Sequence, residues 1–163
     1  MATRTRSLPP DGLYRTSEAL PGKGEKVRAG MLVYFQQRSG DGETPIVLLP
    51  GRNEHNKWRF RRAGFLVRDL AWVGTLKPLL SEGYYLTSEA MELTAQVKLE
   101  AYALVQLGYN REGDPIVFPA RYEGNAIVFE ARGKRFEDLG VFGRLLPAGF
   151  TRPLDGAHFE EDA

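Results

Sequence analysis

The chain carries its densest cluster of cations in one short segment, HNKWRFRR, which begins at His55. Alternate side chains of an extended strand share a face, so Lys57, Arg59 and Arg61 would point the same way. A row of cations on one face can bind phosphate or carboxylate oxygens. The alternative is a solvated face, because a half-exposed strand shows charged residues opposite its buried side. The predicted binding surface is this row with the basic residues nearby in the sequence: Lys57, Arg59, Arg61, Arg62, Arg52 and Arg68.

Residues that could catalyse a reaction or bind a metal are few and poorly spaced. The sequence has no Cys, and its two His residues, His55 and His158, form no metal-binding motif. The pairs Ser17–Glu18 and Ser88–Glu89 place a hydroxyl beside a carboxylate. Adjacent strand residues face opposite ways, however, so that carboxylate cannot take the hydroxyl proton. We therefore predict no catalytic residue, no metal site, no cofactor and no enzymatic activity.

The sequence repeats itself with a spacing of about 70 residues. The segments Gly12–Leu20 and Gly83–Met91 are identical at six of nine positions, at an offset of 71. Three further blocks follow in the same order at offsets of 72, 70 and 69. The alternative explanation, that strand-rich sequences resemble one another, accounts for the shared Pro-Ile-Val but not for the shared Thr-Ser-Glu-Ala. We predict an internal duplication, and we call residues 12–80 the N-terminal half and residues 83–149 the C-terminal half.

The repeat also guides the prediction of secondary structure. The stretch Glu89–Leu107 is rich enough in Ala, Leu and Glu to form a helix, but its part Val97–Leu107 has the alternating apolar residues of a strand. Its counterpart Val27–Phe35 contains Gly30 and β-formers, so we predict that both are strands. Four or five short strands separated by turns fit each half. The predicted fold is all-β, with two tandem diverged β modules of about 70 residues, as small SH3-like barrels, folded sheets or one joint barrel. Residues 1–11 and 150–163 are predicted to be a flexible N-terminal tail and an acidic C-terminal tail.

The two halves differ at the basic row. At an offset of 69, the apolar positions beside the cations stay apolar, and the cations are lost. We therefore predict that the apolar face is buried in both halves and that the basic face belongs to the first alone. In sequence order, Lys57, Trp58, Arg59, Phe60 and Arg61 correspond to Ala126, Ile127, Val128, Phe129 and Glu130.

Charge is divided unevenly along the chain. Residues 1–80 contain 14 Lys and Arg against 7 Asp and Glu, a net +7, whereas residues 81–163 contain 8 against 14, a net −6. Such an asymmetry bears on partners rather than on the fold. No apolar run is long enough for a membrane span or a secretory signal, so we expect a cytoplasmic protein with no membrane partner.

From these observations we predict a non-catalytic binding module, a protein-interaction or scaffold component of a larger assembly. Its expected partner is another protein or a second copy, because the basic and acidic halves complement each other. The alternative is a nucleic-acid-binding protein that contacts DNA or RNA through the basic face of the N-terminal half, where Lys and Arg alternate with aromatic residues.

Overall fold

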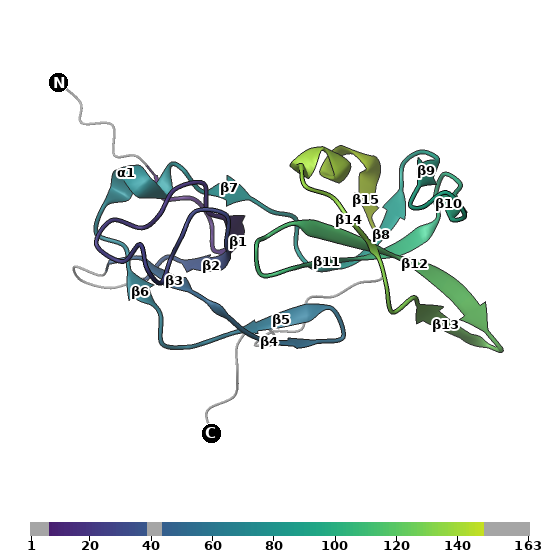
Figure 1. Cartoon of the computed structure of the whole chain (residues 1–163), viewed down its shortest axis with the longest axis horizontal. Helices are drawn as coiled ribbons and strands as arrows, with labels where there is room; N and C mark the ends of the chain where they lie inside the picture. Colours follow the sequence, from purple (N-terminus) through teal and green to yellow (C-terminus); the bar gives the residue numbers. More distant parts are fainter. Residues whose placement is uncertain (1–6, 39–43, 149–163) are drawn as a thin grey trace.

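In the computed structural model, which describes residues 7–38 and 44–148, the chain is built mainly of short strands, so the all-β prediction is confirmed. The N-terminal half forms a five-stranded antiparallel sheet in the order β6-β3-β2-β1-β7 (Figure 1). A separate hairpin of β4 and β5 extends from it. The bounds are β1 Gly12–Arg15, β2 Leu32–Gln36, β3 Ile46–Leu48, β4 Pro50–Glu54, β5 Lys57–Phe60, β6 Phe65–Leu66 and β7 Lys77–Pro78.

The C-terminal half repeats this strand order. Its sheet runs β13-β12-β11-β8-β15, and β14 also pairs with β12, so that β14-β12-β11-β8-β15 matches the first sheet strand for strand. The long β12 takes the places of both β3 and β4. A further hairpin of β9 and β10 lies beside this sheet. The bounds are β8 Gly83–Thr87, β9 Met91–Glu92, β10 Lys98–Leu99, β11 Leu104–Tyr109, β12 Pro115–Glu123, β13 Ala126–Phe129, β14 Lys134–Arg135 and β15 Leu145–Pro147.

Each half also has one short helix before its last strand. Helix α1 (Leu70–Val73) is α-helical, and η1 (Leu139–Arg144) is a 3-10 helix. Asp69 and Asp138 cap them by accepting hydrogen bonds from backbone N–H groups two residues later. In the described part of the chain, neither helix has the length and apolar character needed to cross a membrane.

The buried side chains form two clusters. One lies within the N-terminal half and is centred on Val33, Phe35 and Trp72. The other joins the two halves, because it contains Leu13 and Leu32 from the first sheet together with residues of the second. The interface between the halves is therefore part of the hydrophobic core.

We predicted one long strand over residues 27–35 and another over residues 97–107. In both stretches the prediction is wrong for the first residues, which do not continue the later strand. Strand β2 begins only at Leu32, and the 97–107 stretch is divided into β10 and β11. Both stretches contain a turn at which a residue adopts positive φ, 73° at Gly30 and 63° at Tyr102. A side-chain hydroxyl fixes each turn: Thr16 Oγ1 accepts from Met31 N, and Thr87 Oγ1 accepts from Ala103 N. A strand ladder cannot continue through such a turn.

A β-bulge accounts for one change in the repeat spacing. The ladder of β4 and β5 pairs Pro50 with Phe60 and then Arg52 with Arg59, which leaves Gly51 as an extra residue. The equivalent ladder of β12 and β13 pairs Ala120 with Phe129 and continues without a shift. The N-terminal half thus has one more residue here, and the offset falls from 70 to 69.

Candidate binding surfaces

The β4–β5 hairpin leaves its own sheet and lies against the C-terminal half (Figure 1). Its turn is tied to β11 by Gln106, whose side-chain amide donates to the His55 carbonyl and accepts from Asn56 Nδ2, each at 2.9 Å. Trp58 is 7% exposed and Phe60 is fully buried. The prediction that these two aromatic side chains point inward is confirmed.

Trp58 is the main contact of this hairpin with the C-terminal half. Its indole Nε1 donates a hydrogen bond of 2.6 Å to the carbonyl of Tyr109. The guanidinium of Arg111 lies 4.8 Å from the ring centre, a distance suited to a cation–π contact. The same guanidinium donates to the carbonyls of Pro50 and Gly51 at 3.0 and 3.1 Å. Arg111 of the C-terminal half therefore contacts both strands of the β4–β5 hairpin.

The six cations of the predicted binding surface do not form one free face. Arg52 and Arg59 both pair with the carboxylate of Glu54, at 2.8 and 2.7 Å. The hydrogen bond from Arg59 is the first reason that the pKa of Glu54 is lowered, and the charge of Arg52 adds to it. Lys57 is half-buried, whereas three exposed cations lie beyond β5: Arg61, Arg62 and Arg68. Two of the six cations thus share one carboxylate within the hairpin.

The predicted burial of the second apolar pair is wrong for Ile127, which is 49% exposed. The hairpin of β12 and β13 extends away from the rest of the chain, whereas the β4–β5 hairpin lies on a sheet (Figure 1). Ile127 occupies the ladder position of Trp58, yet no described element covers it. The alternation of the sequence sets which side a residue faces, but not whether something packs on that side.

Four of the six large apolar residues exposed in the described part of the C-terminal half lie on one side of its sheet, whereas the other two, Val97 and Tyr102, lie outside its strands. The ladder register places the four on a common face, since residues that pair across strands point the same way. Tyr122 is 83% exposed, and Tyr84 stacks on Phe129 with ring centres 5.0 Å apart. The sequence did not predict this surface, because a strand with an exposed apolar face and a strand with a buried one have the same alternating pattern. We call it the open face, and it consists of Tyr84, Leu86, Tyr122, Ile127, Phe129 and Leu146.

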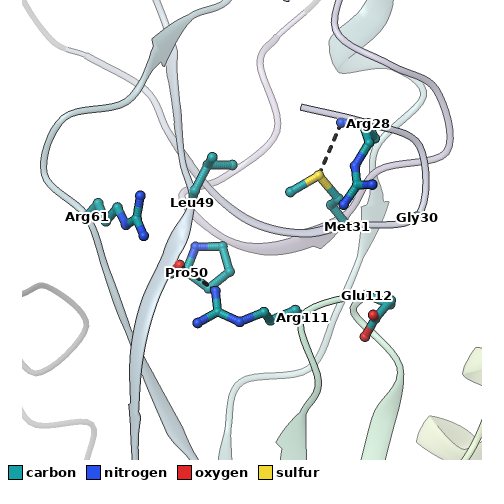
Figure 2. A pocket seen from close by; sticks show the side chains of 8 residues that line it. All are labelled: Arg28, Gly30, Met31, Leu49, Pro50, Arg61, Arg111 and Glu112. Atoms are coloured by element: carbon teal, nitrogen blue, oxygen red, sulfur yellow. Dashed lines mark hydrogen bonds between the residues drawn. The ribbon is translucent and has the colours of Figure 1, made fainter. Parts of the chain in front are cut away.

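A pocket of about 260 Å³ lies between the hairpin and the turn that joins β11 to β12 (Figure 2). Arginines from three distant segments line it: Arg28 precedes β2, Arg61 follows β5, and Arg111 belongs to the turn. Arg61 is a predicted site residue, but no sequence pattern indicates that Arg28 and Arg111 lie beside it. The remaining lining residues are Gly30, Met31, Leu49, Pro50 and Glu112.

Known proteins provide no guide to these surfaces. No protein family, curated protein or solved structure matches this chain. Within the described residues, no group of three or more His, Asp or Glu side chains could hold a metal ion. The geometry of the chain itself must therefore support any functional proposal.

One carboxyl group is buried where the two halves meet. Oε2 of Glu82 accepts a hydrogen bond of 2.8 Å from the backbone N–H of Trp58, and Oε1 is buried with no partner among the described residues. Burial raises the pKa of Glu82 to about 7, against smaller opposing effects of that hydrogen bond and of Lys57. Burial also raises the pKa of Tyr109, whose hydroxyl donates to the carbonyl of Leu80. The interface thus contains a group that titrates near neutral pH.

Proposed function

We propose that this chain is a non-catalytic interaction module, a scaffold component that binds a protein partner through the open face of the C-terminal half. The observation that carries the proposal is the set of apolar and aromatic side chains left uncovered there, with Tyr122 at its edge. Contiguous exposed apolar surface on a small protein commonly marks an interaction site. Tyrosines suit such sites because they bury a large apolar area while keeping a polar tip.

We further propose that the two halves arose by duplication of one β module. The shared strand order supports this origin, as do the matching threonine-bound turns and aspartate caps. Equivalent positions on the two sheets differ in coverage: Leu13 is 5% exposed, whereas Tyr84, at the same place in the opening strand, is 37% exposed. Residues of the C-terminal half pack against Leu13. On the second sheet Gln106 pairs with Tyr84 and holds the β4–β5 turn, so the open face is the part of the corresponding surface that lies beyond this turn.

A second copy of the chain is the partner that best fits the open face. The C-terminal half would then contact the N-terminal half of another molecule, much as the N-terminal half contacts the C-terminal half within one chain. The net charges of −6 on residues 81–163 and +7 on residues 1–80 favour this head-to-tail pairing. A heterologous contact of this kind produces rings or open chains of molecules.

We expect the protein to self-associate with increasing concentration at ~50 mM salt and to dissociate above ~0.5 M salt, where charges are screened. Tyr122→Asn should weaken this association about tenfold, which is the effect of losing about 1.4 kcal/mol of binding free energy. Sedimentation velocity and light scattering measure both effects. Tyr102→Asn is the matched control, since Tyr102 is also an exposed tyrosine but lies outside the open face.

Two results would contradict this proposal. One is a monomer at all concentrations up to ~200 μM in low salt, and the other is an equal effect of Tyr102→Asn.

Titration with short DNA and RNA tests the alternative function in the same preparations. We expect no binding, because Arg52 and Arg59 are both held by Glu54 and do not form one free basic face with the other cations. The alternative would be favoured if duplex DNA bound with an association constant that decreases as salt is added. The slope of the logarithm of this constant against the logarithm of the salt concentration should then be about −0.9 per phosphate contacted.

A further inference from the structure

The arginine-lined pocket has the size and chemistry of a small-ligand site. Its volume is about 260 Å³, just below the lower end of roughly 300 Å³ for pockets that bind drug-sized ligands. One wall is apolar and is formed by Met31, Leu49 and Pro50, while guanidinium groups stand around it (Figure 2). Such a combination of an apolar wall and a few charged groups is typical of sites that bind small organic molecules.

The charges that line the pocket are not balanced. Three arginines face a single carboxylate, that of Glu112, and the lining carries a net charge of +2. In residues 7–38 and 44–148, the guanidinium groups of Arg28 and Arg61 make no hydrogen bond and no ion pair. Arg111 donates only to carbonyl oxygens, which satisfy its N–H groups but do not neutralise its charge. A ligand with two negative charges would balance this site.

The fold does not require arginine at these positions. Arg28 and Glu100 are equivalent, since the carbonyl of each accepts from a threonine hydroxyl, at 2.6 Å from Thr16 and 2.8 Å from Thr87. Arg61 and Glu130 are also equivalent, because their backbone N–H groups donate to the carbonyls of matching residues at 2.9 Å. The C-terminal half thus has carboxylates in both places. The backbone accepts either charge, so the arginines point to a ligand rather than to folding.

We propose that this pocket binds a small phosphate monoester. A phosphate group carries a charge of about −1.5 to −2 at pH 7, which matches the net charge of the lining. The planar guanidinium groups of Arg28 and Arg61 can each donate two parallel hydrogen bonds to its oxygens. The organic part of the ester then packs on Met31, Leu49 and Pro50. The pocket shares no lining residue with the open face, and it does not depend on the proposed protein interaction.

Calorimetric titration of the full chain at ~50 mM salt tests the proposal with three probes: phenyl phosphate, inorganic phosphate and benzoate. We expect phenyl phosphate to bind most tightly, because it combines the dianion with an apolar ring. Arg28→Gln and Arg61→Gln should each weaken its binding about tenfold or more, since each removes hydrogen bonds to a charged group. Arg68→Gln is the matched control, because it removes the same charge from an exposed position outside the pocket.

Several results would overturn the proposal. These are no binding of phenyl phosphate, binding of benzoate with equal affinity, or an equal loss in Arg68→Gln, which would indicate a general effect of net charge. Circular dichroism of each variant establishes that it is folded before titration. Tyr122→Asn should bind phenyl phosphate as the unchanged protein does, so the pocket and the open face can fail independently.

Discussion

Replacing Trp58 with alanine is expected to lower the free energy of unfolding by about 3–5 kcal/mol. The side chain is buried between the two halves, and its removal leaves a cavity beneath the guanidinium of Arg111. It also leaves the carbonyl of Tyr109 without its hydrogen bond from Nε1. Because the hairpin contacts β11, this change should loosen the contact between the halves as well as the hairpin itself.

Urea unfolding followed by circular dichroism measures this effect, with Ile127→Ala as the matched control. Ile127 holds the same ladder position in the second hairpin but is about half exposed, so its removal should cost less than about 1 kcal/mol. Trp58→Phe keeps most of the apolar contact and removes the hydrogen bond, for an expected cost of about 1–3 kcal/mol. Equal losses for Trp58→Ala and Ile127→Ala would contradict our description of how the hairpins differ.

Local sequence patterns predicted which way the side chains of β5 face. Cations and aromatic residues alternate from Lys57 to Arg61. Because successive side chains of an extended segment point to opposite faces, this alternation alone separates the two kinds of residue. The all-β class likewise followed from the alternating apolar residues and the frequent turns. These predictions succeeded because they depend on residues close together in the chain.

Other features depend on contacts that local patterns do not encode. The two hairpins have similar apolar spacing, yet one lies on a sheet and the other does not. The alternation of Val97–Leu107 predicted one strand, because nothing in the identity of Tyr102 signals a positive φ of 63°. The pocket joins Arg28, Arg61 and Arg111 from segments more than 30 residues apart. The fold of the N-terminal half brings Arg28 and Arg61 together, and the packing of the two halves adds Arg111.

The contribution of Glu82 to stability should decrease as the pH rises from about 4.5 to about 7, where its carboxyl is ionised in the unfolded chain but still protonated in the folded chain. The pKa of its carboxyl is about 7 in the folded chain, against 4.5 without the effects of the fold. The folded state therefore binds this proton more tightly than the unfolded state does, and its stability decreases as the proton is lost. A difference of 2.5 pKa units corresponds to about 3 kcal/mol at 1.36 kcal/mol per unit. Above about pH 7 the group is ionised in both states, and its contribution becomes constant.

Glu82→Gln isolates this contribution, because the amide stays neutral while its oxygen can still accept from the N–H of Trp58. Relative to the unchanged protein, the variant should gain about 2–3 kcal/mol of stability between pH 5 and pH 8. Other titrating groups change both proteins alike and cancel in the difference, which urea unfolding at several pH values measures. Glu89→Gln is the matched control, because it removes the same charge from an exposed position. If the difference in free energy of unfolding between Glu82→Gln and the unchanged protein is the same at every pH, burial does not raise the pKa of this carboxyl. The interface then does not make stability depend on pH near neutrality.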